Sequence, residues 1–165
     1  MAMFNLANRY RNGEKTDKNL EKAFHLYQKA AENGYEKEMN SLANCYYNGE
    51  RTEKNLEKAF YWYQKAAENG IKEATFNLAI CYENGEGTEE NLEKAFHLYK
   101  EAAENNVKDA MFSLANKYYN GKGTEKNFKK AFYWYQKAGK NGNEEAMFYL
   151  ANRNRKEFRK SFLLA

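Results

Sequence analysis

Two kinds of amphipathic segment alternate along this chain. The first kind spans about residues 38–48, where Leu42, Ala43 and Tyr46 recur at the three- and four-residue intervals of one helix face before Asn48-Gly49. The second kind spans residues 56–67. At 100° per residue its apolar side chains fall within an arc of about 120°, and they are Leu56, Ala59, Phe60, Tyr63, Ala66 and Ala67. The pattern predicts two helices joined by a short polar connection.

The same two segments return at a constant interval. The glycines that follow the first segment, Gly13, Gly49, Gly85 and Gly121, lie 36 residues apart. Near copies of the second segment are Lys22–Gly34, Lys58–Gly70, Lys94–Asn106 and Lys130–Gly142. A fixed period of this size indicates stacked helical repeats. We therefore expect one all-α solenoid domain over residues 1–165, with repeats 2–37, 38–73, 74–109 and 110–145 and a partial fifth repeat, 146–165.

Residues suited to a left-handed backbone mark the end of the second helix. Gly34, Gly70 and Gly142 occupy that place, and in the remaining repeat Asn106 does, the residue type that tolerates this geometry best after glycine. The start of the helix has two rival N-cap candidates. One is an asparagine (Asn19, Asn55, Asn91, Asn127) and the other is a threonine (Thr16, Thr52, Thr88, Thr124). The sequence pattern leaves both open.

Charge and composition narrow the class of protein. The chain has 27 basic and 23 acidic residues, which interleave and give a net charge of +4. Such mixing is typical of a solvated surface and gives little support for a polyanion partner. The chain opens with no charged-then-apolar leader, and no apolar run approaches the roughly 20 residues that a membrane span needs. We expect a soluble cytoplasmic protein without a membrane span.

Candidate catalytic residues are scattered. His25 and His97 lie two repeats apart, too far to share a metal ion, and no Cys/His cluster has metal-ligand spacing. Cys45 and Cys81 are one period apart, which favours two reduced, partly buried thiols over a disulfide, because packed helices lie about 8–10 Å apart. Gly85-Glu86-Gly87 is interpreted as a turn within the repeat. We predict that the protein is not an enzyme and has no cofactor and no metal site.

The motifs Leu-Ala-x-x-Tyr-x-x-Gly and Lys-Ala-x-x-x-Tyr-x-x-Ala-Ala-x-x-Gly, found over about residues 2–152, resemble those of the Sel-1-like repeats, relatives of the tetratricopeptide repeat. The chain departs from the family at Ala43, Ala79 and Ala115, where the family usually has glycine. The resemblance implies a right-handed α-solenoid superhelix of antiparallel helix pairs that acts as an adaptor or scaffold. It also implies that the first helix of each repeat lines a concave groove.

The groove residues follow from matching the first helices to this pattern. Their carboxamides can pair with both N–H and C=O of an extended peptide, and their phenylalanine rings can take its apolar side chains. The candidate partner-binding residues are Phe4, Asn8, Asn40, Asn44, Tyr47, Phe76, Ile80, Glu83, Phe112, Asn116, Tyr119, Phe148 and Asn152. Two structural alternatives remain open. In one the asparagines are only solvated, and in the other the phenylalanines belong to the core because the helix phase is wrong by one position.

The favoured function is therefore a protein-interaction scaffold that binds a polypeptide segment. One alternative is an RNA-binding helical repeat, which the acidic groove positions Glu73, Asp109 and Glu145 argue against. Another is a structural spacer or a fragment of a larger repeat protein, because the first helix begins without a polar cap and invites end-to-end self-association or further repeats upstream. Residues 153–165 are expected to form a divergent capping helix, with a basic interaction tail as the alternative.

Overall fold

The computed structural model describes residues 2–12, 19–50 and 52–152, with the side chains of residues 2–5, 11 and 20 left out. The expected capping helix over residues 153–165 therefore lies outside the described residues, and so does Thr16. Within the described ranges all regular secondary structure is α-helical. The all-α fold class, with helix pairs repeating every 36 residues, is confirmed.

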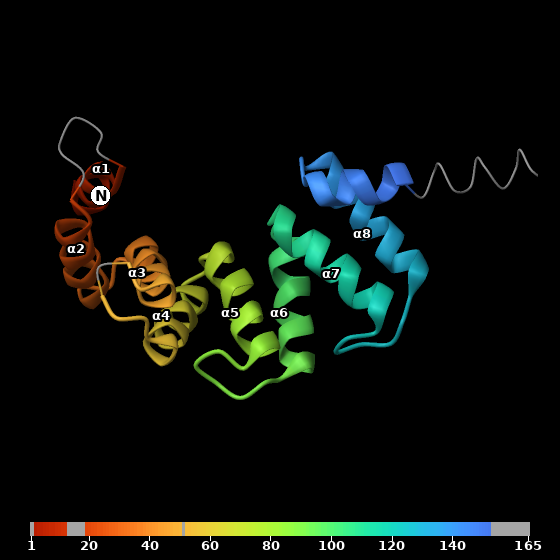
Figure 1. Ribbon diagram of the computed structural model, residues 1–165, viewed down its shortest axis with the longest axis horizontal. Coiled ribbons are helices and arrows are strands. Elements are labelled where there is room, and N and C mark those ends of the chain that lie inside the picture. Colours follow the sequence, from red (N-terminus) through yellow and green to blue (C-terminus); the bar gives the residue numbers. More distant parts are fainter. Residues whose placement is uncertain (1, 13–18, 51, 153–165) are drawn as a thin grey trace, which may run out of the picture. The chain divides into compact units, whose positions relative to one another are not determined.

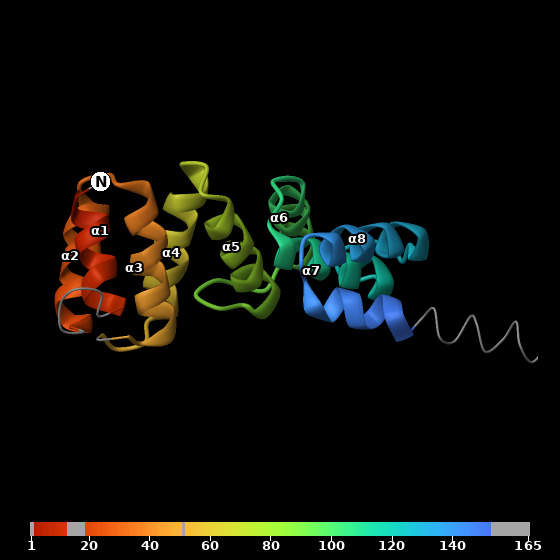
Figure 2. The ribbon, with the colours of Figure 1, turned by 90° about the horizontal axis from the view of Figure 1, so that it is seen from above.

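The helices are α1 (Ala2–Asn12), α2 (Leu20–Glu32), α3 (Glu36–Asn48), α4 (Leu56–Glu68), α5 (Lys72–Asn84), α6 (Leu92–Glu104), α7 (Lys108–Asn120) and α8 (Phe128–Lys140), and residues 144–152 are also helical (Figure 1). We call the odd-numbered helices and residues 144–152 helix A, and the even-numbered helices helix B. The chain divides into two compact units, residues 1–91 with α1 to α5 and residues 92–165 with α6 to α8. Within each unit, helices that are consecutive in sequence pack together, and Figure 2 shows α1 to α4 side by side.

The core of each unit lies between helices A and B. In α3, Leu42, Ala43 and Tyr46 of the predicted apolar face are all buried, which confirms the helix phase, and Glu38 and Met39 are buried with them. Alanines at the helix contacts are fully buried and bring the backbones close together: Ala43, Ala59, Ala66, Ala74, Ala79, Ala102, Ala110, Ala115 and Ala138 each have 0% exposure. Within each unit these alanines lie in helices that pack against the helices consecutive to them in sequence.

Aromatic side chains join consecutive repeats. A phenylalanine of helix B meets the edge of a tyrosine of the next helix A, with ring centroids 5.6 Å apart for Phe24 and Tyr46 and 5.3 Å apart for Phe60 and Tyr82. The same contact recurs in the second unit between Phe96 and Tyr118, at 5.3 Å. Edge-to-face contacts of this kind favour one relative placement of the helices, so they set how adjacent repeats stack.

Asparagine, and not threonine, is the N-cap of helix B wherever that cap is described. Oδ1 of Asn19, Asn55 and Asn127 accepts a hydrogen bond at 2.9 Å from the backbone N–H three residues on. The end of helix B also follows the prediction, because Asn106 has φ of 65° where the other repeats place a glycine. Helix A begins two residues earlier than predicted, at Glu36 in α3, because Tyr35 is already extended directly after the left-handed Gly34.

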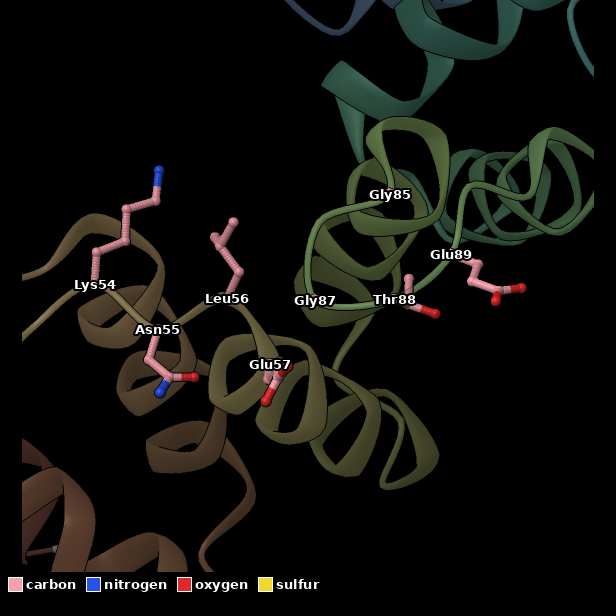
Figure 3. A pocket seen from close by; sticks show the side chains of 8 residues that line it. All are labelled: Lys54, Asn55, Leu56, Glu57, Gly85, Gly87, Thr88 and Glu89. Atoms are coloured by element: carbon pink, nitrogen blue, oxygen red, sulfur yellow. The ribbon is translucent and has the colours of Figure 1, made fainter.

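The loop between helices A and B touches the preceding repeat. Gly87 has φ of 72°, and a β-carbon added there would overlap the backbone carbonyl of Leu56 at the start of α4. Figure 3 shows this loop passing beside Leu56 and Glu57, where it borders an open pocket of about 900 Å³. Gly123 has the same relation to Leu92 in the second unit. These glycines therefore do more than turn the chain within a repeat: they allow contact between repeats.

Candidate functional site

The candidate binding residues share one side of helix A, which we call the helix-A face. In α3 this side presents the half-buried Asn40, Asn44 and Tyr47. In α5 it presents Phe76, Ile80 and Glu83, in α7 Phe112, Asn116 and Tyr119, and at the chain's described end Phe148 and Asn152. None of these is fully buried, and neither is Asn8 of α1; Phe148 is 70% exposed. Phe4 lies in α1, and its side chain is among those left out.

Three asparagines of this face are tied to helix B of their own repeat. The Tyr63 hydroxyl of α4 donates to Asn44 Oδ1 at 2.7 Å. The Tyr27 hydroxyl donates in the same way to Asn8 at 2.8 Å, and the Tyr135 hydroxyl donates to Asn116. Each tyrosine is buried, with 1% to 3% exposure, so its hydroxyl needs a partner inside the protein. The asparagine supplies that partner.

This hydrogen bond limits the hydrogen bonds that Asn8, Asn44 and Asn116 can form with a bound peptide. We expected each carboxamide to serve an extended peptide as both donor and acceptor, but Oδ1 already accepts from tyrosine, so the side chain offers chiefly the two N–H groups of Nδ2. Nor are these side chains merely solvated, which was the alternative. Sequence reasoning missed the pair, although tyrosine follows asparagine by 19 residues at Asn8, Asn44 and Asn116. Ile80 stands at the matching position of the third repeat and has no amide.

Tyr47 links α3 to the next loop. Its hydroxyl donates to Glu86 Oε2 at 2.9 Å, and its ring centroid lies 6.2 Å from that of Tyr63. The pKa of Tyr47 is raised from 10.0 to about 12. Burial is the largest cause of this rise, and the hydrogen bond to Glu86 is the next largest. Burial raises the pKa of the Cys81 thiol, a free cysteine of α5, from 9.0 to about 12. Sequence reasoning did not foresee this cluster, because its members come from separate repeats.

Folding stability should fall in alkaline solution because of these groups. Tyr47 and Cys81 hold their protons more tightly in the folded chain than in the unfolded one, since the folded pKa of each is raised. Their contribution is therefore fully present below about pH 9 and is lost as the pH rises toward about 12. Urea unfolding between pH 8 and pH 11 should show this decline, and Tyr47→Phe should make it shallower. An unchanged slope in that variant would contradict the assignment.

In the second unit, aromatic rings surround a cavity on the helix-A face. The cavity has a volume of about 430 Å³ and is lined by Phe112 and Asn116 of α7, Tyr135 of α8, and Glu144, Glu145, Phe148 and Tyr149 of the helix that follows. Tyr149 stacks on Tyr135 with ring centroids 4.0 Å apart, and Phe112 lies 5.8 Å from Tyr135 on the same measure. The cavity thus combines apolar walls with two carboxylates and one amide.

The described residues contain no group of three or more His, Cys, Asp or Glu side chains placed to hold a metal ion. His25 and His97 are both exposed and belong to different units. Over the same part of the chain, no helix combines the length and the apolar character that a bilayer span requires. The helix-A face and the cavity on it present amide donors, aromatic surfaces and carboxylates.

The sequence profile of the Sel1 repeat matches residues 1–35, 39–71, 72–107 and 108–143. The chain therefore belongs to the Sel1 repeat family, which confirms the resemblance drawn from the Leu-Ala and Lys-Ala motifs. Sel1 repeats are generally non-catalytic scaffolds for protein interactions. None of the curated proteins matches this chain.

Several solved structures share the fold. The chain is similar to c5321, a protective antigen of uropathogenic Escherichia coli strains with an SLR fold, at 31% identity and a TM-score of 0.85 over 93% of this chain and 33% of that one. It is similar to a Sel1 repeat protein from Oxalobacter formigenes at 34% identity and a TM-score of 0.84, over 88% of this chain and 58% of that one. It is also similar to cysteine rich protein B of Helicobacter pylori, at 32% identity and a TM-score of 0.63, over 80% of this chain and 95% of that one. The chain thus spans less than two thirds of the first two proteins.

Proposed function

We propose that this protein is an interaction scaffold that binds polypeptide segments on the helix-A face of each unit. The observation that supports this most directly is the set of asparagines anchored by tyrosine, Asn44 in the first unit and Asn116 in the second. The hydrogen bond from tyrosine holds the carboxamide in one orientation, so its N–H donors are preorganised for backbone carbonyls of an extended chain. Preorganised donors bind with a smaller loss of side-chain entropy than free ones.

Aromatic side chains beside these amides supply the apolar part of the surface. Phe76 and Phe112 are half-buried on helix A, and Tyr119 is 41% exposed. Large, partly desolvated aromatic side chains commonly dominate the binding energy of protein interfaces. Alternating amide donors and aromatic surfaces suit the backbone and the apolar side chains of the same polypeptide.

The test replaces this chemistry without disturbing the fold. Asn116→Asp keeps an oxygen that accepts from the Tyr135 hydroxyl but removes the N–H donors, so helix packing is retained. Combined with Phe76→Ala and Phe112→Ala, it should weaken capture of partner proteins from the native cell by about tenfold or more, given the usual cost of truncating central aromatic residues. Circular dichroism should show unchanged helicity.

The matched control adds acidic charge away from the helix-A face. Gln64→Glu and Gln136→Glu alter exposed positions of α4 and α8, and this pair should capture the same proteins as the wild type. If the triple variant captures its partners as well as the wild type, the binding site lies elsewhere. If nuclease treatment removes the captured proteins, an RNA carries the interaction and the proposal is wrong.

A further inference from the structure

We propose that the cavity of the second unit is a subsite for a lysine or arginine side chain of the bound polypeptide. The inference rests on the proposed function and assigns a specificity to one part of the helix-A face. Its basis is the combination of aromatic walls, formed by Phe112, Tyr135 and Tyr149, with the carboxylates of Glu144 and Glu145 at the same cavity.

The paired carboxylates set this repeat apart from the others. At the equivalent two positions the other helices A combine one acid with one base, which are Glu36-Lys37 in α3, Lys72-Glu73 in α5 and Lys108-Asp109 in α7. Only Glu144-Glu145 has two acids. Both side chains are exposed, and neither forms an ion pair with another described residue. The pair is therefore neutral overall in those three helices, whereas beside the cavity it carries two negative charges.

Helix capping alone does not explain the second acid. Acidic residues in the first turn stabilise a helix through its dipole, and one acid fulfils that role in α5 and α7. The start of the helix is also capped by Asn143, which is buried and whose Oδ1 accepts from the Ala146 N–H at 2.9 Å. The additional carboxylate thus adds negative potential where the helix is already capped.

A basic side chain satisfies both features of the cavity at once. The methylene stem of lysine or arginine packs against apolar surface while its charged end stays near water. A cation is also attracted to the faces of tyrosine and phenylalanine rings. In the cavity it meets the two carboxylates of the lining, and the Asn116 amide, which also lines the cavity, can donate to the peptide backbone. An acidic side chain would meet like charge at the same place.

Peptide libraries provide the test. Four heptapeptide libraries have random residues at six positions and a central arginine, lysine, citrulline or glutamate; citrulline has the shape of arginine without its charge. The full chain should retain the arginine and lysine libraries about fivefold or more over the citrulline library, as expected for a partly desolvated cation between rings and carboxylates. The glutamate library should be retained least.

Two double variants locate the effect. Glu144→Gln with Glu145→Gln should abolish the preference for arginine over citrulline. Glu36→Gln with Glu73→Gln removes the same total charge from exposed first-turn positions of the first unit and should leave the preference intact. Equal losses in both variants would show general attraction by net charge and would overturn the subsite.

The remaining outcomes separate the subsite from the proposed function. If the arginine and citrulline libraries bind equally and Phe112→Ala weakens both, polypeptide binding stands and the basic subsite is wrong. If none of the libraries binds the wild-type chain, the proposed function itself is contradicted. If light scattering shows self-association that Glu144→Gln with Glu145→Gln reverses, while no library is enriched, the occupant is a second copy of this chain and the assignment to a partner fails.

Discussion

Tyr63→Ala is expected to lower the free energy of unfolding by about 3–5 kcal/mol, the usual range for truncating a large aromatic side chain in a core. Tyr63 is 3% exposed between α3 and α4, and its hydroxyl donates to Asn44. The substitution removes the ring from the core, leaves a cavity and deprives Asn44 of the bond that orients it. Urea unfolding followed by circular dichroism measures the loss.

Two further variants separate packing from hydrogen bonding. Tyr63→Phe keeps the ring and removes only the hydroxyl, so it should cost about 1 kcal/mol. Tyr61→Ala alters a tyrosine two residues away that is 52% exposed, and its effect should stay within about 0.5 kcal/mol. A loss below about 1 kcal/mol for Tyr63→Ala would contradict the inward position of this ring.

Gly87→Ala is expected to cost about 2–4 kcal/mol, because it adds two penalties. The backbone at Gly87 has φ of 72°, which disfavours any residue with a β-carbon, and the new methyl group would overlap the Leu56 carbonyl. Relief of that overlap requires the loop to move away from α4. The contact between two repeats is then weakened, which thermal or urea unfolding detects.

Gly70→Ala is the matched control. Its φ of 82° imposes a similar conformational penalty, but nothing lies within 4 Å of the position that a β-carbon would take. We expect a cost of about 1 kcal/mol from the left-handed backbone alone, and Gly70→Asn should cost less, since Asn106 occupies the equivalent place in the next repeat. Equal losses for Gly87→Ala and Gly70→Ala would mean that the close approach to Leu56 has no energetic weight.

Local features of the fold were predictable because the sequence pattern of each one occurs in several repeats. The helix phase in α3 and the left-handed conformation of Asn106 both match the structure. These features depend on residues within a turn or two of one another, where helical periodicity and backbone preference decide the outcome. The sequence left two N-cap candidates open, and in the structure the Lys58 N–H donates to Asn55 Oδ1.

Contacts between repeats were harder to predict. The bond from Tyr47 to Glu86 joins residues 39 positions apart, and the contact of Gly87 with Leu56 joins a loop to an earlier helix. Neither contact follows from periodicity. The period identifies equivalent positions in successive repeats, but it does not show which residues are in contact. The candidate site shows the same division. The helical phase indicated the side of α7 that carries Phe112, but not the cavity that it shares with Glu144 and Glu145.

The amino-acid sequence by itself determined the repeat, its helix pairs and the residues that end each helix, because those depend on local backbone preferences and on the spacing of apolar side chains. Tertiary structure alone decided which polar groups meet. Asn44 became an anchored donor because a tyrosine 19 residues away is buried with a hydroxyl that must find an acceptor. The cavity became acidic and aromatic because packing brings α7, α8 and residues 144–152 together around it.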